Sequence, residues 1–324
     1  MKAAYIEHSG PPEAIQFGDL ATPPMGADDA TVKVTAVTVN PVDTYIRSGA
    51  YQVDMPFPFV IGRDMTGVVV ECGRRVSRFR PGDRVWCNNQ GYAGRQGTFS
   101  ELVVVEERLL YPLPSADPIA TVAVVHSGLT AAIGLFERAH IESGETVFVN
   151  GGDGNVGTAV LQLAKGTGAR VAVTAGTPEK AEWCRELGAH SVIDYKHDDV
   201  TAAVRAFAPE GVDVYWDASA ALDLDAALAV IAHRGRIVVM SGLDRRTVLR
   251  VGAFYTRNCS LFGFTVTDAT VDELSMCATR LNDAIARGAL RARIHSVVPL
   301  SHAAEAHRLV ERGGVFGKIV LVPE

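Results

Sequence analysis

A glycine-rich turn between a strand and a helix restricts the possible folds of this chain more than any other feature. The turn reads Gly152-Asp153-Gly154-Asn155-Val156-Gly157; the apolar run Thr146–Asn150 precedes it, and the helical pattern Asn155–Lys165 follows it. The first glycine allows the tight turn, the second lets the backbone approach a diphosphate, and the third lets the helix pack on the strand. The free N–H groups of the helix N-terminus face the anion. This context favours a dinucleotide site over a purely structural turn.

Strands and helices continue to alternate beyond this turn. The expected strands are Arg170–Ala175, Ser191–Ile193, Val212–Trp216, Arg236–Met240 and Ser260–Thr265, and a further helix begins after Thr177. Such alternation predicts a parallel, doubly wound α/β sheet. Before about residue 120, short β-rich runs and Gly/Pro turns predict a compact antiparallel domain with little helix. The tail is expected to contain the helices Val271–Arg287 and His302–Arg312 and the strands Ile294–Val298 and Lys318–Val322.

The length of 324 residues is sufficient for two domains. No long linker separates the tail from the middle of the chain. We therefore expect a nucleotide-binding domain at 122–265, inserted into a β-rich domain that is formed by 1–121 and completed by 266–324.

The end of the second expected strand bears on the choice of cofactor. NAD sites use an acidic residue there, whereas this strand ends Val173-Thr174-Ala175-Gly176 and continues Thr177-Pro178-Glu179-Lys180. A lysine in the first turn of a helix opposes the macrodipole, unless a 2′-phosphate neutralises both. Thr177 and Lys180 are thus candidate phosphate ligands. A plain N-cap with a solvated lysine is the alternative, and Glu179 could contact a ribose, so NADPH is favoured over NADH without being established.

Several further segments resemble one known family. They are Val39–Tyr51 (VNPVDTYIRSGAY), Pro81–Val85, Gly97–Glu101, Thr130–Ala132, Thr174–Ala181 and Phe316–Lys318. Together with the glycine-rich turn they span nearly the whole chain, and in this order they resemble the zinc-independent quinone oxidoreductase (zeta-crystallin-like) family of the medium-chain dehydrogenase/reductase superfamily. The resemblance implies a GroES-like β-rich catalytic domain plus a Rossmann domain. It also implies hydride transfer from NADPH by homodimers joined through Ser260–Phe264.

The same resemblance assigns candidate site residues. Asn40, Asp43, Tyr45 and Tyr51 are implied to line the catalytic cleft near the nicotinamide. The implied cofactor ligands outside the turn are Thr130, Gly176, Lys180, Tyr195, Gly242, Phe264 with its neighbours Gly263 and Thr265, Arg312 and Lys318. Asp153 departs from the pattern, because relatives often have small uncharged residues in the turn. Since its carboxylate would repel a diphosphate, we expect Asp153 to turn outward.

The zinc alcohol dehydrogenases share this fold, so a metal site has to be considered. A catalytic zinc needs three protein ligands of the Cys, His or carboxylate type. Zinc relatives have Gly-His-Glu where this chain has Gly62-Arg63-Asp64, and a cationic arginine does not ligate zinc. Only Cys87 lies in the region where a structural zinc site would need several cysteines. His302 and His307 lie on one expected helix, for which a solvated face is the simpler interpretation. We expect no metal.

Without a Lewis acid, the favoured substrates are ones that accept hydride readily, namely quinones and alkenes conjugated to a carbonyl. An enone also needs a proton, and Tyr51 and Tyr45 are the best-placed acids by resemblance, because a phenol is protonated at neutral pH. Packing, cofactor contact and a proton from solvent are the alternatives. We therefore keep three hypotheses: an NADPH:quinone reductase, an enone or enoyl-thioester reductase, and a non-catalytic NADPH-binding protein.

Composition excludes some other classes of function. The formal net charge is −6, and no basic tract or zinc-finger spacing indicates nucleic acid as a partner. The apolar runs in the sequence are shorter than the roughly 20 residues of a membrane helix, so no membrane partner is expected. The five cysteines are scattered and form no C-x-x-C pair, which indicates free thiols in a reducing cytoplasm.

Overall fold

Strand β9 (Thr146–Asn150), which precedes the glycine-rich turn, lies inside a six-stranded parallel sheet. The strand order is β11-β10-β9-β12-β13-β14. The chain adds strands on one side of β9 as far as β11 and then crosses to β12 on the other side of β9. The other strands are β10 (Arg170–Ala175), β11 (Ser191–Asp194), β12 (Val212–Asp217), β13 (Ile231–Val239) and β14 (Ser260–Gly263). The computed structural model describes all 324 residues and confirms the predicted doubly wound sheet.

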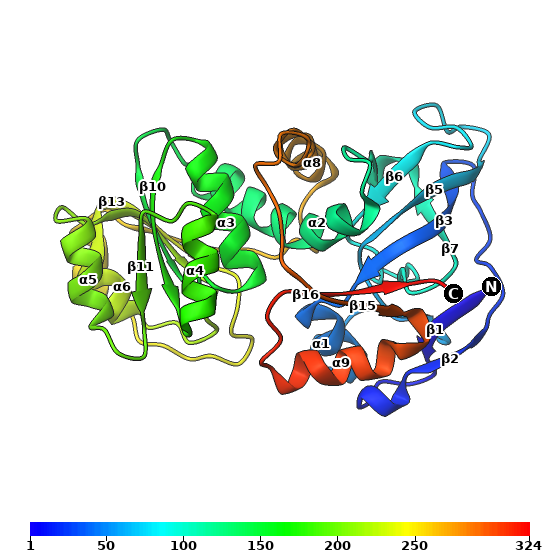
Figure 1. Ribbon diagram of the computed structural model, residues 1–324, viewed down its shortest axis with the longest axis horizontal. Coiled ribbons are helices and arrows are strands. Elements are labelled where there is room, and N and C mark those ends of the chain that lie inside the picture. The colour runs from blue at the N-terminus through cyan, green and yellow to red at the C-terminus, as the bar shows by residue number, and fades with distance from the viewer. The chain divides into compact units, whose positions relative to one another are not determined.

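Helices cover both faces of this sheet, as Figure 1 shows. One face bears α3 (Asn155–Gly166) and α4 (Pro178–Glu186), and the other bears α5 (Val200–Phe207) and α6 (Leu224–Val230). Alternate strand residues point to the second face, where Phe148, Tyr215 and Ile237 pack with the buried side chains of α5 and α6. Fully burying side chains of this size contributes about 1.5–3 kcal/mol each to the free energy of unfolding. The short helix α7 (Val251–Tyr255) precedes β14.

Most of the remaining strands form a seven-stranded sheet. Its strand order is β15-β16-β3-β5-β6-β8, and β7 also pairs with β3. These strands are β3 (Asp29–Thr38), β5 (Met65–Cys72), β6 (Arg84–Cys87), β7 (Leu102–Glu106), β8 (Leu110–Pro112), β15 (Ile294–Pro299) and β16 (Lys318–Val322). A smaller sheet contains β1 (Lys2–Ile6), β2 (Gln16–Asp19) and β4 (Phe59–Val60). The helices of this part are α1 (Pro41–Ser48), α8 (Val271–Ala286) and α9 (Ala303–Arg312).

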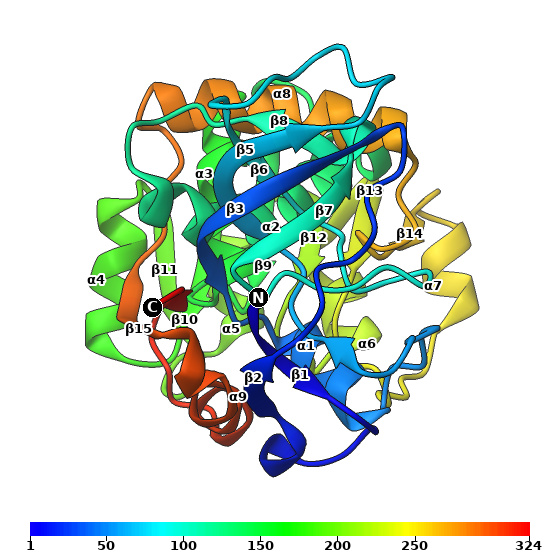
Figure 2. The ribbon, with the colours of Figure 1, turned by 90° about the vertical axis from the view of Figure 1, so that its right-hand side faces the viewer.

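The chain forms two compact units, and the C-terminal tail belongs with the N-terminal region. Unit 1 comprises Met1–His126 and Leu274–Glu324, and unit 2 comprises Ser127–Glu273. The pairing explains the grouping: Val320 and Leu321 of β16 lie opposite Thr38 and Val37 of β3. In addition, Trp86 Nε1 donates to Asn282 Oδ1 at 2.9 Å, which fixes α8 beside β6 (Figure 2).

Helix α2 (Pro118–Ala132) was not predicted. It corrects the expectation that every apolar run is shorter than a membrane helix. With the helical turn Ile133–Arg138 it forms a continuous stretch of 21 residues that is long and apolar enough to cross a membrane. However, 78% of its most apolar window is buried inside the protein, as in a core helix. A helix that is apolar on all sides has no amphipathic stripe, so the periodicity of its sequence gave no helix signal.

Candidate functional site

Close packing explains why the turn after β9 needs glycine. A Cβ atom on Gly152 would lie 2.4 Å from Val173 Cβ, and one on Gly157 would lie 2.2 Å from the carbonyl oxygen of Gly151. Gly151 itself has φ of +81°, in the left-handed region that favours glycine. The backbone of the turn therefore lies directly against β10 and against its own helix, as the motif predicts.

The first turn of α3 has no side-chain cap. Its N-cap residue is Gly154, and the first hydrogen bond across this cap runs from Thr158 N to Gly154 O at 2.9 Å. The amides of Val156 and Gly157 precede that bond and have no acceptor within the helix. An uncapped helix N-terminus beside a glycine turn fits the diphosphate of a dinucleotide.

Polar side chains at the carboxyl ends of three strands support the turn. Gly151 N donates to Thr174 Oγ1 at 2.7 Å, and Asn150 Nδ2 donates to Asp217 Oδ2 at 3.0 Å. Asp217 is fully buried and also accepts from Ser219 N. The sequence pattern did not predict Asn150, Thr174 and Asp217 as site residues. A usable signal existed, because Asn150 ends one predicted parallel strand and Asp217 directly follows another.

The residues implied to surround a 2′-phosphate come together at the end of β10. A Cβ atom on Gly176 would lie 2.5 Å from the hydroxyl of Tyr195, which is half exposed. Thr177 Oγ1 accepts from Lys180 N, so Thr177 is the N-cap of α4. Asp153 does turn away from the helix N-terminus, but not into solvent. Its Oδ2 accepts from Gly176 N at 3.1 Å and lies 3.3 Å from Lys180 Nζ.

In unit 1, a buried polar cluster gathers residues from distant parts of the chain. Asn40 caps α1 in a capping box, in which its backbone N–H donates to Asp43 Oδ2 at 2.7 Å. Asn40 Nδ2 donates to Asp64 Oδ2 at 3.0 Å, and Asp64 also accepts from Thr38 N at 2.9 Å. Lys318 Nζ donates to Asn40 Oδ1. Since Lys318 is 2% exposed, this placement does not support the expectation that it reaches the cofactor phosphates.

The pKa values of two groups in this cluster are strongly shifted. Burial, and then the charge of Asp64, raise the pKa of Asp43 to about 7. The Oδ1 atom of Asp43 is buried and has no hydrogen-bond partner. Burial also lowers the pKa of Lys318, against the opposing charges of Asp64 and Asp43. Perturbed carboxyls of this kind concentrate at functional sites, and the place of Asn40 and Asp43 in a catalytic cleft stays a prediction.

Arg63, which was predicted only to be incompatible with zinc, lies next to Asp43. Its Nη2 donates to Asn89 Oδ1, and the side chain is 1% exposed. Arg63 and Asp43 line a small cavity together with Phe59, Ile61 and Gly91. A buried guanidinium held by an amide oxygen is a fixed positive charge beside the carboxyl of Asp43.

The two candidate tyrosines follow this cluster along the chain. Tyr45 lies on α1 and is 46% exposed, and Tyr51 N donates to the carbonyl of Tyr45 at 3.0 Å after the helix ends. His126 Nδ1 lies 3.1 Å from Asn88 Oδ1. Burial, Lys318 and Arg63 hold the pKa of His126 well below its usual value, so this ring is neutral at pH 7.

The other candidates are scattered over both units. Thr130 is buried in α2, and Phe264 packs edge-on against Trp216 with ring centroids 6.0 Å apart. Gly242 follows β13 with φ of +86°. Arg312 is exposed in the last turn of α9.

Two family models match the chain, one to each kind of domain. The model described as "Alcohol dehydrogenase GroES-like domain" matches residues 26–115, and "Zinc-binding dehydrogenase" matches 155–280. The quinone oxidoreductase of Mus musculus is 31% identical over 328 residues, covering 99% of this chain and 98% of the relative. This chain belongs to the quinone oxidoreductase family. The family is part of the medium-chain dehydrogenase/reductase superfamily, whose members are oxidoreductases.

Relatives of this quinone oxidoreductase family member differ in their named activities. The NADPH-dependent alkenal/one oxidoreductase of Arabidopsis thaliana is 31% identical and covers 100% of the chain, which spans 80% of that protein. A crystal structure of an NAD-dependent alcohol dehydrogenase superposes with a TM-score of 0.91 at 30% identity, with 100% of both chains covered. A mycobacterial protein solved with NADPH gives 0.87 at 29% identity over the same coverage. The expected GroES-like and Rossmann combination is confirmed, and a nicotinamide cofactor fits the glycine turn.

Metal-ligating side chains do not converge in this family member. No group of three or more His, Cys, Asp or Glu side chains is arranged to hold a metal ion. The interpretation of His302 and His307 as a solvated pair is wrong for His307, which is fully buried and packs edge-on against Phe99. The reason is helical spacing, because His307 shares the inner face of α9 with Ala303 and Ala306.

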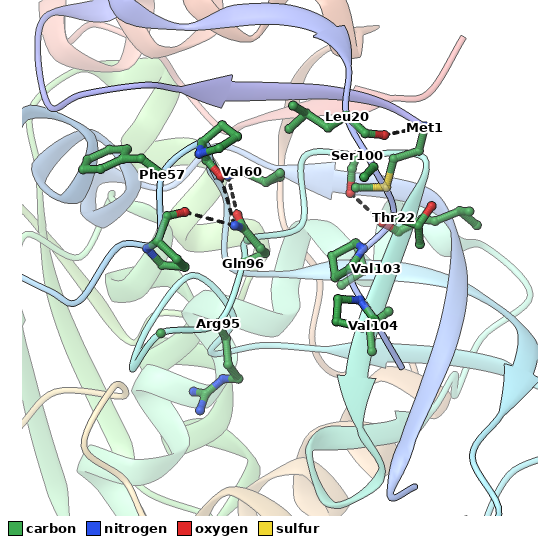
Figure 3. A pocket seen from close by; sticks show the side chains of 18 residues that line it. Met1, Leu20, Thr22, Phe57, Val60, Arg95, Gln96, Ser100, Val103 and Val104 are labelled. Atoms are coloured by element: carbon green, nitrogen blue, oxygen red, sulfur yellow. Dashed lines mark hydrogen bonds between the residues drawn. The ribbon is translucent and has the colours of Figure 1, made fainter. Parts of the chain in front are cut away.

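A separate groove crosses unit 1 of this family member, as Figure 3 shows. Gln96 fixes one wall, because Val60 N donates to Gln96 Oε1 at 2.6 Å and Gln96 Nε2 donates to the carbonyls of Pro56 and Pro58. Leu102–Val104 of β7 and the segment Leu20–Pro24 also line it. None of the candidate cofactor or catalytic residues lines this groove.

Proposed function

We propose that this oxidoreductase is an NADPH-dependent quinone oxidoreductase, which transfers hydride from NADPH to quinones without zinc. The observation that carries the proposal is the glycine turn packed against β10 with the uncapped N-terminus of α3 beside it. Quinone oxidoreductases are prominent among its relatives. Solved relatives include an NAD-dependent enzyme and an NADPH complex, so the family likeness alone does not choose between the two cofactors. The proposed preference for NADPH is therefore argued from the residues at the end of β10.

The candidate cofactor-binding residues have the following roles in this proposal. The amides of Val156 and Gly157 bind the diphosphate, and Gly152, Gly154 and Asn155 shape the turn around it. Thr177, Lys180, Gly176 and Tyr195 surround the 2′-phosphate. Thr130, Gly242, Phe264 and Arg312 are further cofactor contacts, and we leave Lys318 in the buried cluster. When bound, NADPH supplies the hydride, and the protein orients the nicotinamide and excludes water.

Asn40 and Asp43 contribute polarity to the catalytic cleft, and Tyr51 and Tyr45 are its candidate proton donors. Quinone reduction needs little help from such a donor, whereas enone reduction does. Arg63 supports the absence of a catalytic zinc. It stands where zinc relatives have histidine, and its guanidinium is buried and bonded to Asn89.

The second candidate function is reduction of activated alkenes, such as enones or enoyl thioesters. The named activity of the Arabidopsis relative favours it. In this case Tyr51 is a true general acid. The third hypothesis, a non-catalytic NADPH-binding protein, becomes one outcome of the experiment.

The test is NADPH oxidation by the purified protein with a panel of quinones, enones and enoyl-CoA, repeated with NADH and with a chelator. We expect quinone reduction, a preference for NADPH and no effect of chelation. Enone turnover that exceeds quinone turnover selects the alkene reductase. Tight NADPH binding without turnover on the whole panel selects the non-catalytic protein, and loss of activity on chelation overturns the metal-free proposal.

Tyr51→Phe separates the two enzyme functions. Removing the phenol hydroxyl is expected to lower kcat for enones by about 100-fold and to leave quinone reduction nearly unchanged. Tyr5→Phe is the matched control, because it removes a phenol hydroxyl that contacts Gln16 on β2. Equal effects of both variants on enone reduction would remove Tyr51 as a proton donor.

We also propose a homodimer formed through β14. This strand pairs only with β13, so its other edge is free within the chain. Leu261 on β14 is 42% exposed, and Val251 and Tyr255 nearby in sequence are also exposed. Sedimentation of the wild-type protein and of Leu261→Lys tests it, and we expect a dimer and a monomer respectively. A cytoplasmic location completes the proposal, and the five free cysteines agree with it.

A further inference from the structure

The second strand of the nucleotide-binding sheet lacks a carboxylate at its end, but a carboxylate from elsewhere lies there. NAD sites place an Asp or Glu at this position to bind the ribose 2′-hydroxyl. Here β10 ends at Ala175 and is followed by Gly176 and Thr177. Asp153, from the glycine turn, reaches this position instead, and its Oδ2 accepts from Gly176 N at 3.1 Å.

The same carboxylate neutralises the cation that a 2′-phosphate needs. Asp153 Oδ2 lies 3.3 Å from Lys180 Nζ, and the two side chains are 12% and 29% exposed. Lys180 lies in the first turn of α4, where a positive charge is unfavourable without an anion nearby. Asp153 already supplies that anion. A 2′-phosphate would therefore have to compete with Asp153 for Lys180 and would also be repelled by it.

The backbone on both sides of Asp153 limits its freedom to move away. Gly152 packs against Val173, with no room even for a Cβ atom, and Gly154 N donates to Gly151 O at 3.2 Å. Just after β10, the Tyr195 hydroxyl covers Gly176 so closely that a Cβ atom there would lie 2.5 Å from it. The carboxylate is thus held between the turn and the end of β10.

We infer that Asp153 is a specificity-determining residue of the dinucleotide site, which weakens NADPH binding and permits NADH to bind. In the NADH complex, the carboxylate held by Gly176 and Lys180 accepts the ribose 2′-hydroxyl. In the NADPH complex, it opposes the 2′-phosphate. This inference rests on the proposed dinucleotide-dependent function. It adds that the chain uses both cofactors, and that Asp153 limits its discrimination between NADPH and NADH.

Calorimetric titration of the full-length protein with NADPH and with NADH tests the inference without any substrate. Asp153→Asn keeps the acceptor for Gly176 N and removes the charge. We expect the dissociation constant for NADPH to fall about 10-fold and that for NADH to rise or to change less than about 3-fold. Asp153→Ser makes the same charge change with a different side chain and is expected to shift the ratio in the same direction. Circular dichroism confirms that each variant is folded.

Two controls make the result specific. Glu182→Gln on α4 removes an equal charge from an exposed pair with Arg185, and its ratio of NADPH to NADH affinity is expected to match wild type. Adding Lys180→Met to Asp153→Asn is expected to abolish the gain for NADPH.

The outcomes distinguish this inference from the proposed function. If wild type binds neither dinucleotide, the proposed function fails and the inference falls with it. If both dinucleotides bind, but the folded Asp153 variants keep the wild-type ratio or move it toward NADH, the inference alone is overturned.

Discussion

The glycine turn of unit 2 and the buried polar cluster of unit 1 are built from different kinds of groups. The turn is made of consecutive residues, and its important groups are backbone amides and missing Cβ atoms. The cluster is made of side chains from Thr38, Asn40, Asp64 and Lys318, which are brought together by β3, α1 and β16. The turn is therefore sensitive to added volume, whereas the cluster is sensitive to lost charge. Four substitutions test this contrast.

The largest effect is expected from Lys318→Met. Removing the ammonium group takes away the cation that bonds to Asn40 Oδ1. The buried carboxyls of Asp64 and Asp43 then lose the favourable charge of Lys318. Breaking a buried charge arrangement by removing one partner costs about 3–5 kcal/mol of unfolding free energy. Urea unfolding measures it, with the exposed Lys33→Met on β3 as control. Equal stability of the two variants would show that the cluster does not depend on charge.

The next effect is a pH dependence that Asp43→Asn removes. The pKa of Asp43 is about 7 in the folded protein, above its ordinary value of 3.8. Between these pH values the folded state holds a proton that the unfolded state has released, so stability falls as pH rises from about 4 to about 7. Over that window we expect Asp43→Asn to gain roughly 3 kcal/mol relative to wild type. Unfolding midpoints at several pH values measure this, with the exposed Asp54→Asn as the control variant.

Gly157→Val tests the turn by adding volume. The new Cβ atom would lie 2.2 Å from the Gly151 carbonyl oxygen, so the turn must open. We expect the affinity for NADPH to fall about 100-fold, or about 2.7 kcal/mol. Gly166→Ala, in the same helix but with nothing within 4 Å of its Cβ position, is the control. Wild-type affinity in Gly157→Val would contradict the close-packing argument.

The smallest effect is expected from Thr174→Val. It removes the acceptor for Gly151 N while keeping the shape of the side chain. The loss of one hydrogen bond costs about 1 kcal/mol, which corresponds to about a 5-fold weaker NADPH affinity. Thr167→Val, whose hydroxyl bonds only to a carbonyl of its own helix, is the control. If both variants bind NADPH equally, β10 does not position the turn.

The same contrast explains how much of the fold and the site could be predicted from sequence. The turn, β9, α3 and β10 were predicted closely, because glycine requirements and apolar periodicity are local properties. Helices α1, α5 and α6 were not predicted, since they are only seven or eight residues long. The contact of Lys318 with Asn40 was not predicted, because the two residues lie 278 residues apart and no local pattern reports that contact. The pairing of Asp153 with Lys180 was missed for the same reason.

Both termini of the chain contribute to unit 1, and this has a consequence for biosynthesis. Unit 2 is one uninterrupted segment, so it can collapse while translation is still under way. Unit 1 must wait for β16, because β3 lacks its neighbour until Lys318–Val322 have been made. Until then its exposed β-rich surface is at risk of aggregation. Nascent-chain pausing before β16 would thus be most harmful to unit 1.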